Sequence, residues 1–114
     1  MQSVKARVQD MIKGTRVLVF SKTYCPYCDE AKNIFKSAEV QYEAHELDTM
    51  GSEGSQIQDA LKDITGQKTV PNIFINGIHI GGCSDLKTKI SNGQVMQIFD
   101  DAQIHYNLWD SPYH

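Results

Sequence analysis

The sequence predicts an α/β domain in which a four-stranded mixed sheet is flanked by about five helices. Three observations support this fold class. Segments with the pattern of strands alternate with segments of helical spacing along the chain. A strand–helix–strand order comes first, and it implies parallel strands joined by a helical crossover. Later, two apolar runs flank Asn76-Gly77, which is a strong short-range signal for an antiparallel hairpin.

The first half of the chain predicts two helices around one buried strand. Residues 1–14 form an amphipathic helix, because their apolar side chains recur at helical spacing: Val4, Val8, Met11 and Ile12. Residues 16–21 are a short β-branched run typical of a buried strand. The next helix begins at Pro26, since proline is favoured at the first helical position, and Cys25 becomes its N-cap. Its inner face is then Ala31, Ile34, Phe35 and Ala38.

The second half predicts the remaining elements by the same patterns. Gly66 stops one helix, and a Ser-Asp pair at residues 84–85 caps another. The expected elements are a strand at 40–47, a loop at 50–55, a helix at 55–66, a hairpin at 69–82, and helices at 84–91 and 92–108.

Size and charge narrow the class of protein. The 114 residues suit one domain, and a chain with 40% hydrophobic and 22% charged residues has an ordinary globular composition. A net charge of −3 argues against binding a nucleic-acid backbone. No apolar run approaches the roughly 20 residues of a membrane span, and no secretory signal is evident. We expect one domain over residues 1–114, with a core at about 4–108, a loose tail at 109–114, and neither nucleic acid nor membrane as a partner.

The chain has three cysteines, of which Cys25 and Cys28 form a CxxC pair. An odd count without a signal argues against a secreted disulfide scaffold and favours a reducing compartment, most simply the cytoplasm. In that setting the pair is catalytic or binds a metal. Zinc would need Cys83 and one histidine as further ligands, but the histidines show no ligand spacing. Two inert structural thiols are the other alternative, and a CxxC after a strand favours thiol–disulfide exchange over both.

Local electrostatics assign different roles to the two cysteines. The N-terminus of a helix offers unpaired N–H groups and a positive dipole end, which stabilise a thiolate at Cys25. Lys22 is close in sequence and adds positive charge. Asp29 adjoins Cys28, so Cys28 is expected to remain a thiol more readily than Cys25. Cys25 is therefore the predicted nucleophile, and Cys28 is the resolving thiol that attacks a mixed disulfide.

Three motifs together resemble the dithiol glutaredoxin family. They are KTYCPYC at 22–28, TVPNIFING at 69–77 and GGCSDL at 81–86, in the order and spacing of that family. The resemblance covers roughly residues 4–99. It implies a thioredoxin-like fold and a glutathione-dependent thiol–disulfide oxidoreductase that reduces protein–glutathione mixed disulfides and protein disulfides.

The resemblance also implies how glutathione binds. Lys22 and Gln67 approach its glycine carboxylate, Val70 pairs with its cysteinyl backbone, and Pro71 follows a cis peptide bond. The segment 83–85 takes the γ-glutamyl end, although Asp85 could serve only as a helix cap. The implied glutathione-binding residues are Lys22, Tyr27, Gln67, Thr69, Val70, Pro71, Gly82, Cys83, Ser84 and Asp85.

Partners follow from the same resemblance. Glutathione is the co-substrate and no metal is expected; glutathionylated or disulfide-containing proteins are the targets, and glutathione reductase with NADPH supplies reductant indirectly. Nothing in the sequence demands more than a monomer. The alternative is a carrier of a [2Fe–2S] cluster ligated by the nucleophilic cysteine and glutathione. Cluster-binding relatives tend to have serine or glycine after that cysteine, where this chain has Pro26.

Overall fold

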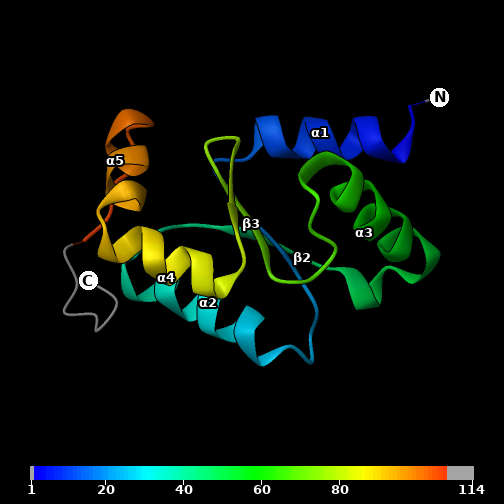
Figure 1. Ribbon diagram of the computed structural model, residues 1–114, viewed down its shortest axis with the longest axis horizontal. Coiled ribbons are helices and arrows are strands. Elements are labelled where there is room, and N and C mark those ends of the chain that lie inside the picture. The colour runs from blue at the N-terminus through cyan, green and yellow to red at the C-terminus, as the bar shows by residue number, and fades with distance from the viewer. Residues whose placement is uncertain (1, 108–114) are drawn as a thin grey trace.

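The computed structural model describes residues 2–107 of the chain (Figure 1). The observed order of helices and strands is the predicted one, with one short 3₁₀ turn added. The elements are α1 (Val4–Gly14), β1 (Val17–Ser21), α2 (Pro26–Ser37), β2 (Glu43–Glu46), η1 (Leu47–Thr49), α3 (Gly51–Thr65), β3 (Asn72–Ile75), β4 (Ile78–Gly81), α4 (Cys83–Ser91) and α5 (Gln94–Asp101).

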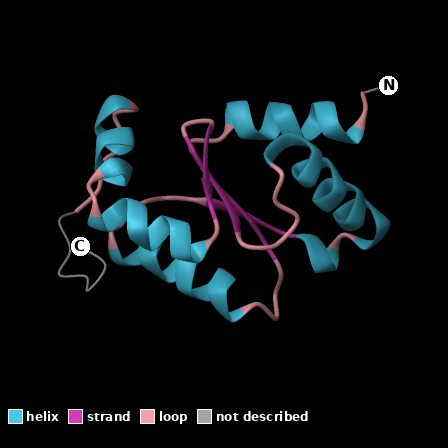
Figure 2. Cartoon of the chain, viewed as in Figure 1, coloured by secondary structure: helices cyan, strands magenta, loops and turns pink. Residues whose placement is uncertain are grey.

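The four strands form one mixed sheet in the order β2-β1-β3-β4 (Figure 2). The β1 and β2 strands are parallel and joined through α2, as the strand–helix–strand order predicted. The β3 strand is antiparallel to both β1 and β4. Asn76 and Gly77 connect β3 to β4 with positive φ angles of 51° and 77°, which is the backbone of a type I′ hairpin turn. The predicted hairpin is confirmed.

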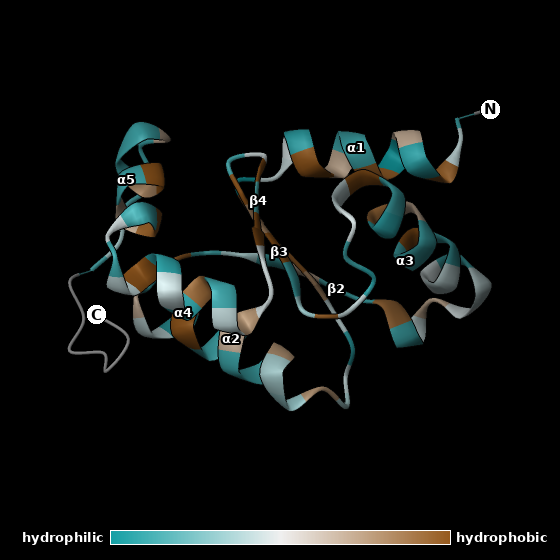
Figure 3. Cartoon of the chain, viewed as in Figure 1, coloured by the Kyte–Doolittle hydropathy of each residue, from teal (hydrophilic) through white to brown (hydrophobic). Residues whose placement is uncertain are grey.

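Helices cover both faces of the sheet, and the two central strands, β1 and β3, divide their side chains between two apolar cores. Val17 and Val19 of β1 face the core that α2, α4 and α5 complete. Leu18 and Phe20 face the opposite core, which α1 and α3 complete. Figure 1 shows the helices in these two groups, and Figure 3 shows hydrophobic residues on β3 between them. Successive side chains of a strand point to opposite faces of the sheet, so one strand contributes to both cores.

Several predicted helix boundaries are wrong. The segment 50–55 was expected to be a loop, but α3 begins at Gly51. Gly54 explains the difference: a Cβ atom there would lie far inside van der Waals contact with the backbone carbonyl of Leu47. Glycine at this position is a packing residue that brings α3 close to η1, rather than a sign of a loop. A glycine-rich composition cannot distinguish these two uses.

The last helix ends earlier than its apolar spacing predicted. It stops at Asp101 because Gln103 takes a left-handed φ of 57° and the Ile104 N–H bonds the Phe99 carbonyl at 2.8 Å. This six-to-one bond is the closure of a Schellman motif, which glycine usually supplies. The α4 helix likewise begins at Cys83, with Gly82 rather than Ser84 as its N-cap. The predicted loose tail at 109–114 lies outside the described residues. Within residues 2–107, no helix combines the length and apolar character needed to span a membrane.

Replacing Gly54 by alanine should destabilise the fold. The added methyl group would push α3 away from the Leu47 carbonyl, and overpacking of this kind costs about 1–3 kcal/mol. Urea unfolding would measure the change. Gly14→Ala is the matched control, because a Cβ atom there meets nothing within 4 Å and alanine favours a helix by up to about 1 kcal/mol. Equal stability of the two variants would contradict the packing role of Gly54.

Candidate active site

Cys25 is the N-cap of α2, and its sulfur caps the helix. The Cys28 N–H donates to Cys25 Sγ at 3.2 Å, and the Asp29 N–H donates to the Cys25 carbonyl at 3.1 Å. Pro26 occupies the first turn, where its missing N–H costs nothing. The sulfur therefore sits at the positive end of the helix dipole, as predicted. Cys25 is partly exposed, so it is accessible to a substrate.

Cys28 lies directly behind Cys25 and is 0% exposed. Burial, followed by its hydrogen bond with Cys25, raises the pKa of the Cys28 thiol from its ordinary 9.0 to about 11. The prediction that Cys28 stays a thiol is therefore supported in direction. The reason offered from sequence was wrong, because burial and the neighbouring sulfur dominate over the charge of Asp29.

The loop that faces Cys25 contains the expected cis peptide bond between Val70 and Pro71. The Cys25 thiol lies 3.8 Å from the Val70 carbonyl, to which it donates. The Gln67 side-chain amide braces the loop by donating to the carbonyls of Thr69 and Pro71, each at 3.0 Å. Both amide hydrogens of Gln67 are thereby engaged within the chain. This gives Gln67 a bracing function that the sequence did not indicate.

Asn72 fixes the same loop from beneath and was missed by sequence reasoning. Its side chain is fully buried. It donates to the Gln67 carbonyl at 3.3 Å, and its Oδ1 lies 2.9 Å from His79 Nε2. A polar residue flanked by apolar ones was the available signal, since buried amides are retained where they are hydrogen-bonded.

A groove of about 670 Å³ adjoins Cys25 and gathers most of the predicted binding residues. The cis-proline loop forms one wall and the start of α4 forms the other. Its lining comprises Tyr27, Thr69, Val70, Pro71, Gly82, Cys83, Ser84, Lys87 and Thr88. Of the predicted set, Lys22, Gln67 and Asp85 are outside this lining. Lys87 and Thr88 were missed, because they come directly after the recognised motif, one helical turn beyond Cys83 and Ser84.

Asp85 holds the α4 wall in place. Its Oδ2 accepts from the Gly82 N–H at 2.9 Å, so the helix-cap alternative for Asp85 is observed. Gly81 makes this possible, because it has a φ of 113° and a Cβ atom there would collide with the Asp85 carboxylate. The first turn of α4, at Cys83 and Ser84, thus presents its N-terminal end to the groove.

Two exposed tyrosines lie close to Cys25 in the sequence, one just before it and one inside the CxxC pair. Tyr27 is 66% exposed and lines the groove, whereas Tyr24 is 70% exposed and lies outside it. The Lys22 ammonium lies 6.0 Å from the centre of the Tyr24 ring. Thr23 anchors this loop by donating its N–H to Asp48 at 2.9 Å and its hydroxyl to the same carboxylate. These bonds and the nearby Lys22 lower the pKa of Asp48.

Comparisons with known proteins agree with this geometry. The glutaredoxin family profile matches residues 17–80. A glutaredoxin from Ricinus communis is 46% identical over 96 residues, spanning 84% of this chain and 93% of the relative. This chain belongs to the glutaredoxin family.

Further glutaredoxins extend the match to nearly the whole fold. Glutaredoxin-C2 of Arabidopsis thaliana is 43% identical over 96 residues, covering 84% of this chain and 86% of that protein. A crystal structure of the buckwheat glutaredoxin–glutathione complex superposes with a TM-score of 0.83 and 38% identity, covering 90% of this chain and 92% of the other. Glutaredoxins are glutathione-dependent thiol–disulfide oxidoreductases, and this chain is one of these enzymes.

Cys83 is the third thiol of this glutaredoxin, and it lies buried in the groove wall. Burial, and then the charge of Glu30, raises the pKa of Cys83 to about 11. Glu30 on α2 also forms an ion pair with Lys87 on α4, which ties the two helices together beside the groove. Among residues 2–107, no group of three or more histidine, cysteine or acidic side chains is placed to hold a metal ion.

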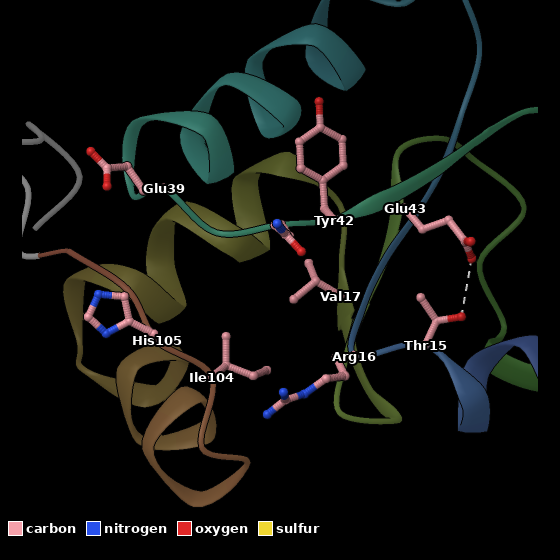
Figure 4. A pocket seen from close by; sticks show the side chains of 9 residues that line it. Thr15, Arg16, Val17, Glu39, Tyr42, Glu43, Ile104 and His105 are labelled. Carbon is pink, nitrogen blue, oxygen red and sulfur yellow. Dashed lines mark hydrogen bonds between the residues drawn. The ribbon is translucent and has the colours of Figure 1, made fainter.

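A second hollow of about 500 Å³ lies at the other end of β1 (Figure 4). Thr15, Arg16 and Val17 at the start of that strand line it, together with Ile104 and His105 of the C-terminal segment. Figure 4 shows the hydrogen bond between Thr15 and Glu43 at its edge, which measures 3.2 Å. Both cysteines of the CxxC pair follow the opposite end of β1, so this hollow is separate from the thiol chemistry.

Cys28 should remain protonated well into the alkaline range in the reduced protein. Its raised pKa means that the thiol is the stable form below about pH 11 and that thiolate forms only as the pH rises toward that value. The Cβ chemical shift of Cys28, followed by NMR against pH, measures this directly. A midpoint near the ordinary pKa of 9.0 would contradict the effect of burial.

Proposed function

We propose that this glutaredoxin reduces protein–glutathione mixed disulfides and protein disulfides, with Cys25 as nucleophile and Cys28 as resolving thiol. The observation that carries the proposal is the position of Cys25 Sγ. It caps α2 at 3.2 Å from the Cys28 N–H, and it lies beside the groove between the cis-proline loop and α4. An accessible sulfur at a helix N-terminus is suited to attack a disulfide.

The mixed-disulfide reaction needs only Cys25. Its thiolate attacks the glutathionyl sulfur, the protein–glutathione bond breaks, and the protein leaves as a thiolate that takes a proton from water. Cys25 now carries glutathione. A second glutathione, as thiolate, attacks this disulfide, which releases oxidised glutathione and restores Cys25. The net reaction consumes one free glutathione for each protein thiol released, and the other half of the oxidised glutathione comes from the substrate.

A protein disulfide requires both cysteines. Cys25 attacks one sulfur and forms a mixed disulfide with the protein. Cys28 then attacks Cys25 Sγ, forms the Cys25–Cys28 bond and releases the second protein thiol. Two glutathiones reopen that bond. Glutaredoxin potentials of roughly −200 to −230 mV allow a reduced glutathione pool to drive this step.

The groove is suited to glutathione in both shape and chemistry. The backbone of Val70 offers an extended edge for the cysteinyl part, in the manner of an added strand. The N-terminal turn of α4 offers N–H groups to the γ-glutamyl carboxylate. Lys22 supplies a cation for the glycine carboxylate on the other side of Cys25. The Gln67 amide acts here by bracing the loop, since both its hydrogens are already donated.

The cellular setting is part of the proposal. We place the enzyme in the cytoplasm, because an odd number of cysteines favours a reducing compartment, where glutathione reductase and NADPH supply reduced glutathione. The groove and both reactive cysteines come from one chain, so a monomer suffices. The cluster-carrier alternative has no observation in its favour, because Pro26 and a complete cysteine pair are typical of the oxidoreductase.

Replacing Cys28 by serine should preserve reduction of a small glutathione mixed disulfide and abolish reduction of a protein disulfide. Replacing Cys25 by serine should abolish both, because no other sulfur caps α2. The measurement is NADPH oxidation coupled to glutathione reductase, with both substrates and all three proteins. Gly14→Ala is the control, because Gly14 ends α1, away from the CxxC pair and the groove.

Activity of Cys25→Ser with the glutathione mixed disulfide would show that the nucleophile is assigned to the wrong sulfur. An inactive wild-type protein with all thiols reduced would show that the groove does not serve glutathione.

A further inference from the structure

A chain of hydrogen bonds runs from the edge strand β4 to the cis-proline loop, through the buried side chain of Asn72. His79 lies opposite Phe74 in the register of β4 and β3, and the two rings pack with their centroids 5.1 Å apart. Asn72 precedes Phe74 by two residues, so its side chain points to the same face of the sheet. His79 Nε2 lies 2.9 Å from Asn72 Oδ1, and Asn72 Nδ2 donates to the Gln67 carbonyl at 3.3 Å. The half-buried imidazole thus reaches the loop through one amide group.

The direction of each bond in this chain is determined. An amide oxygen only accepts, so the hydrogen between His79 and Asn72 lies on His79 Nε2. Burial, and then the charge of Lys89, lowers the pKa of His79, so the neutral ring carries its one N–H there. The amide oxygen of Asn72 is directed toward this donor, and its nitrogen toward the Gln67 carbonyl. Loss of the donor would leave that buried oxygen without its partner and remove the bond that fixes the orientation of the amide.

Gln67 is the end of the chain that meets the active site. Its side-chain amide donates to the carbonyls of Thr69 and Pro71, each at 3.0 Å. These two carbonyls lie on either side of Val70, whose own carbonyl accepts from the Cys25 thiol at 3.8 Å. The segment along which we place the cysteinyl part of glutathione is therefore held on both sides by one glutamine. The backbone carbonyl of that same glutamine is the group that the buried amide holds.

We propose that His79 is a positioning residue for glutathione binding: its N–H fixes the Asn72 amide and, through it, the loop backbone at Val70. The inference rests on the proposed position of glutathione along Val70, and it adds a residue that lies outside the lining of the groove. The sulfur of Cys25 is held separately, as the N-cap of α2. Loss of the His79 donor should therefore weaken reactions that require glutathione in the groove and spare the intrinsic reactivity of the nucleophile.

Two substitutions separate the donor from the ring. His79→Phe keeps a ring against Phe74 and removes the N–H, whereas His79→Gln removes the ring and keeps an N–H donor of similar reach. The measurements are kcat/KM for a small glutathione mixed disulfide, coupled to glutathione reductase, and the rate at which iodoacetamide alkylates Cys25. In His79→Phe, kcat/KM should fall about fivefold, as expected for one buried hydrogen bond, while alkylation keeps the wild-type rate. His79→Gln should keep most of the wild-type kcat/KM.

Wild-type kcat/KM in His79→Phe, or an equal loss in the two variants, would overturn the proposal, because the N–H would then not be the group that matters. A parallel fall in the alkylation rate would also overturn it, since the whole active site would then be disturbed. Nitrogen NMR of the His79 ring in the wild-type protein is an independent check. A hydrogen on Nε2 supports the proposal, and a hydrogen on Nδ1 alone overturns it. A wild-type protein that does not reduce the glutathione mixed disulfide would instead refute the proposed function, on which the inference rests.

Discussion

The hydrogen bond from the Cys28 N–H to Cys25 Sγ is the interaction on which the active site depends. It places one sulfur at the N-terminal end of α2 and draws the next turn of helix, with the second sulfur, behind it. Any helix start must satisfy such orphan N–H groups. In this protein Cys25 Sγ accepts from one of these N–H groups and is also the reactive atom. The start of the helix therefore holds the nucleophile in place. The asymmetry between the two thiols follows, because only one of them is reached from solvent.

The sheet positions the cis-proline loop opposite Cys25. The β1 strand delivers the CxxC loop, and its antiparallel neighbour β3 begins directly after the cis-proline loop. The Val70 carbonyl therefore comes within 3.8 Å of Cys25. The start of α4, fixed by the Asp85 cap, completes the groove. Segments distant in sequence meet because the strand order β2-β1-β3-β4 sets β1 beside β3.

The sequence predicted what local patterns encode, and it missed what tertiary contacts decide. The helix start at Pro26 and the turn at Asn76-Gly77 were predicted correctly, because these residue types strongly favour those local conformations. The start of α3 was wrong, because Gly54 serves a contact with Leu47 that no local pattern reveals. The assignment of Cys25 as nucleophile and Cys28 as resolving thiol stays a prediction. The raised pKa of Cys28 agrees with it, through burial rather than through the charge of Asp29.

The central claim is that the sulfur capping α2 accepts the glutathionyl group and that the adjoining groove holds it. The most direct test is a crystal structure of Cys28→Ser trapped as its glutathione mixed disulfide. The account predicts a bond from glutathione to Cys25, the cysteinyl backbone along Val70, and the γ-glutamyl end at the first turn of α4. Glutathione attached to Cys83, or attached to Cys25 but lying outside the groove, would contradict it.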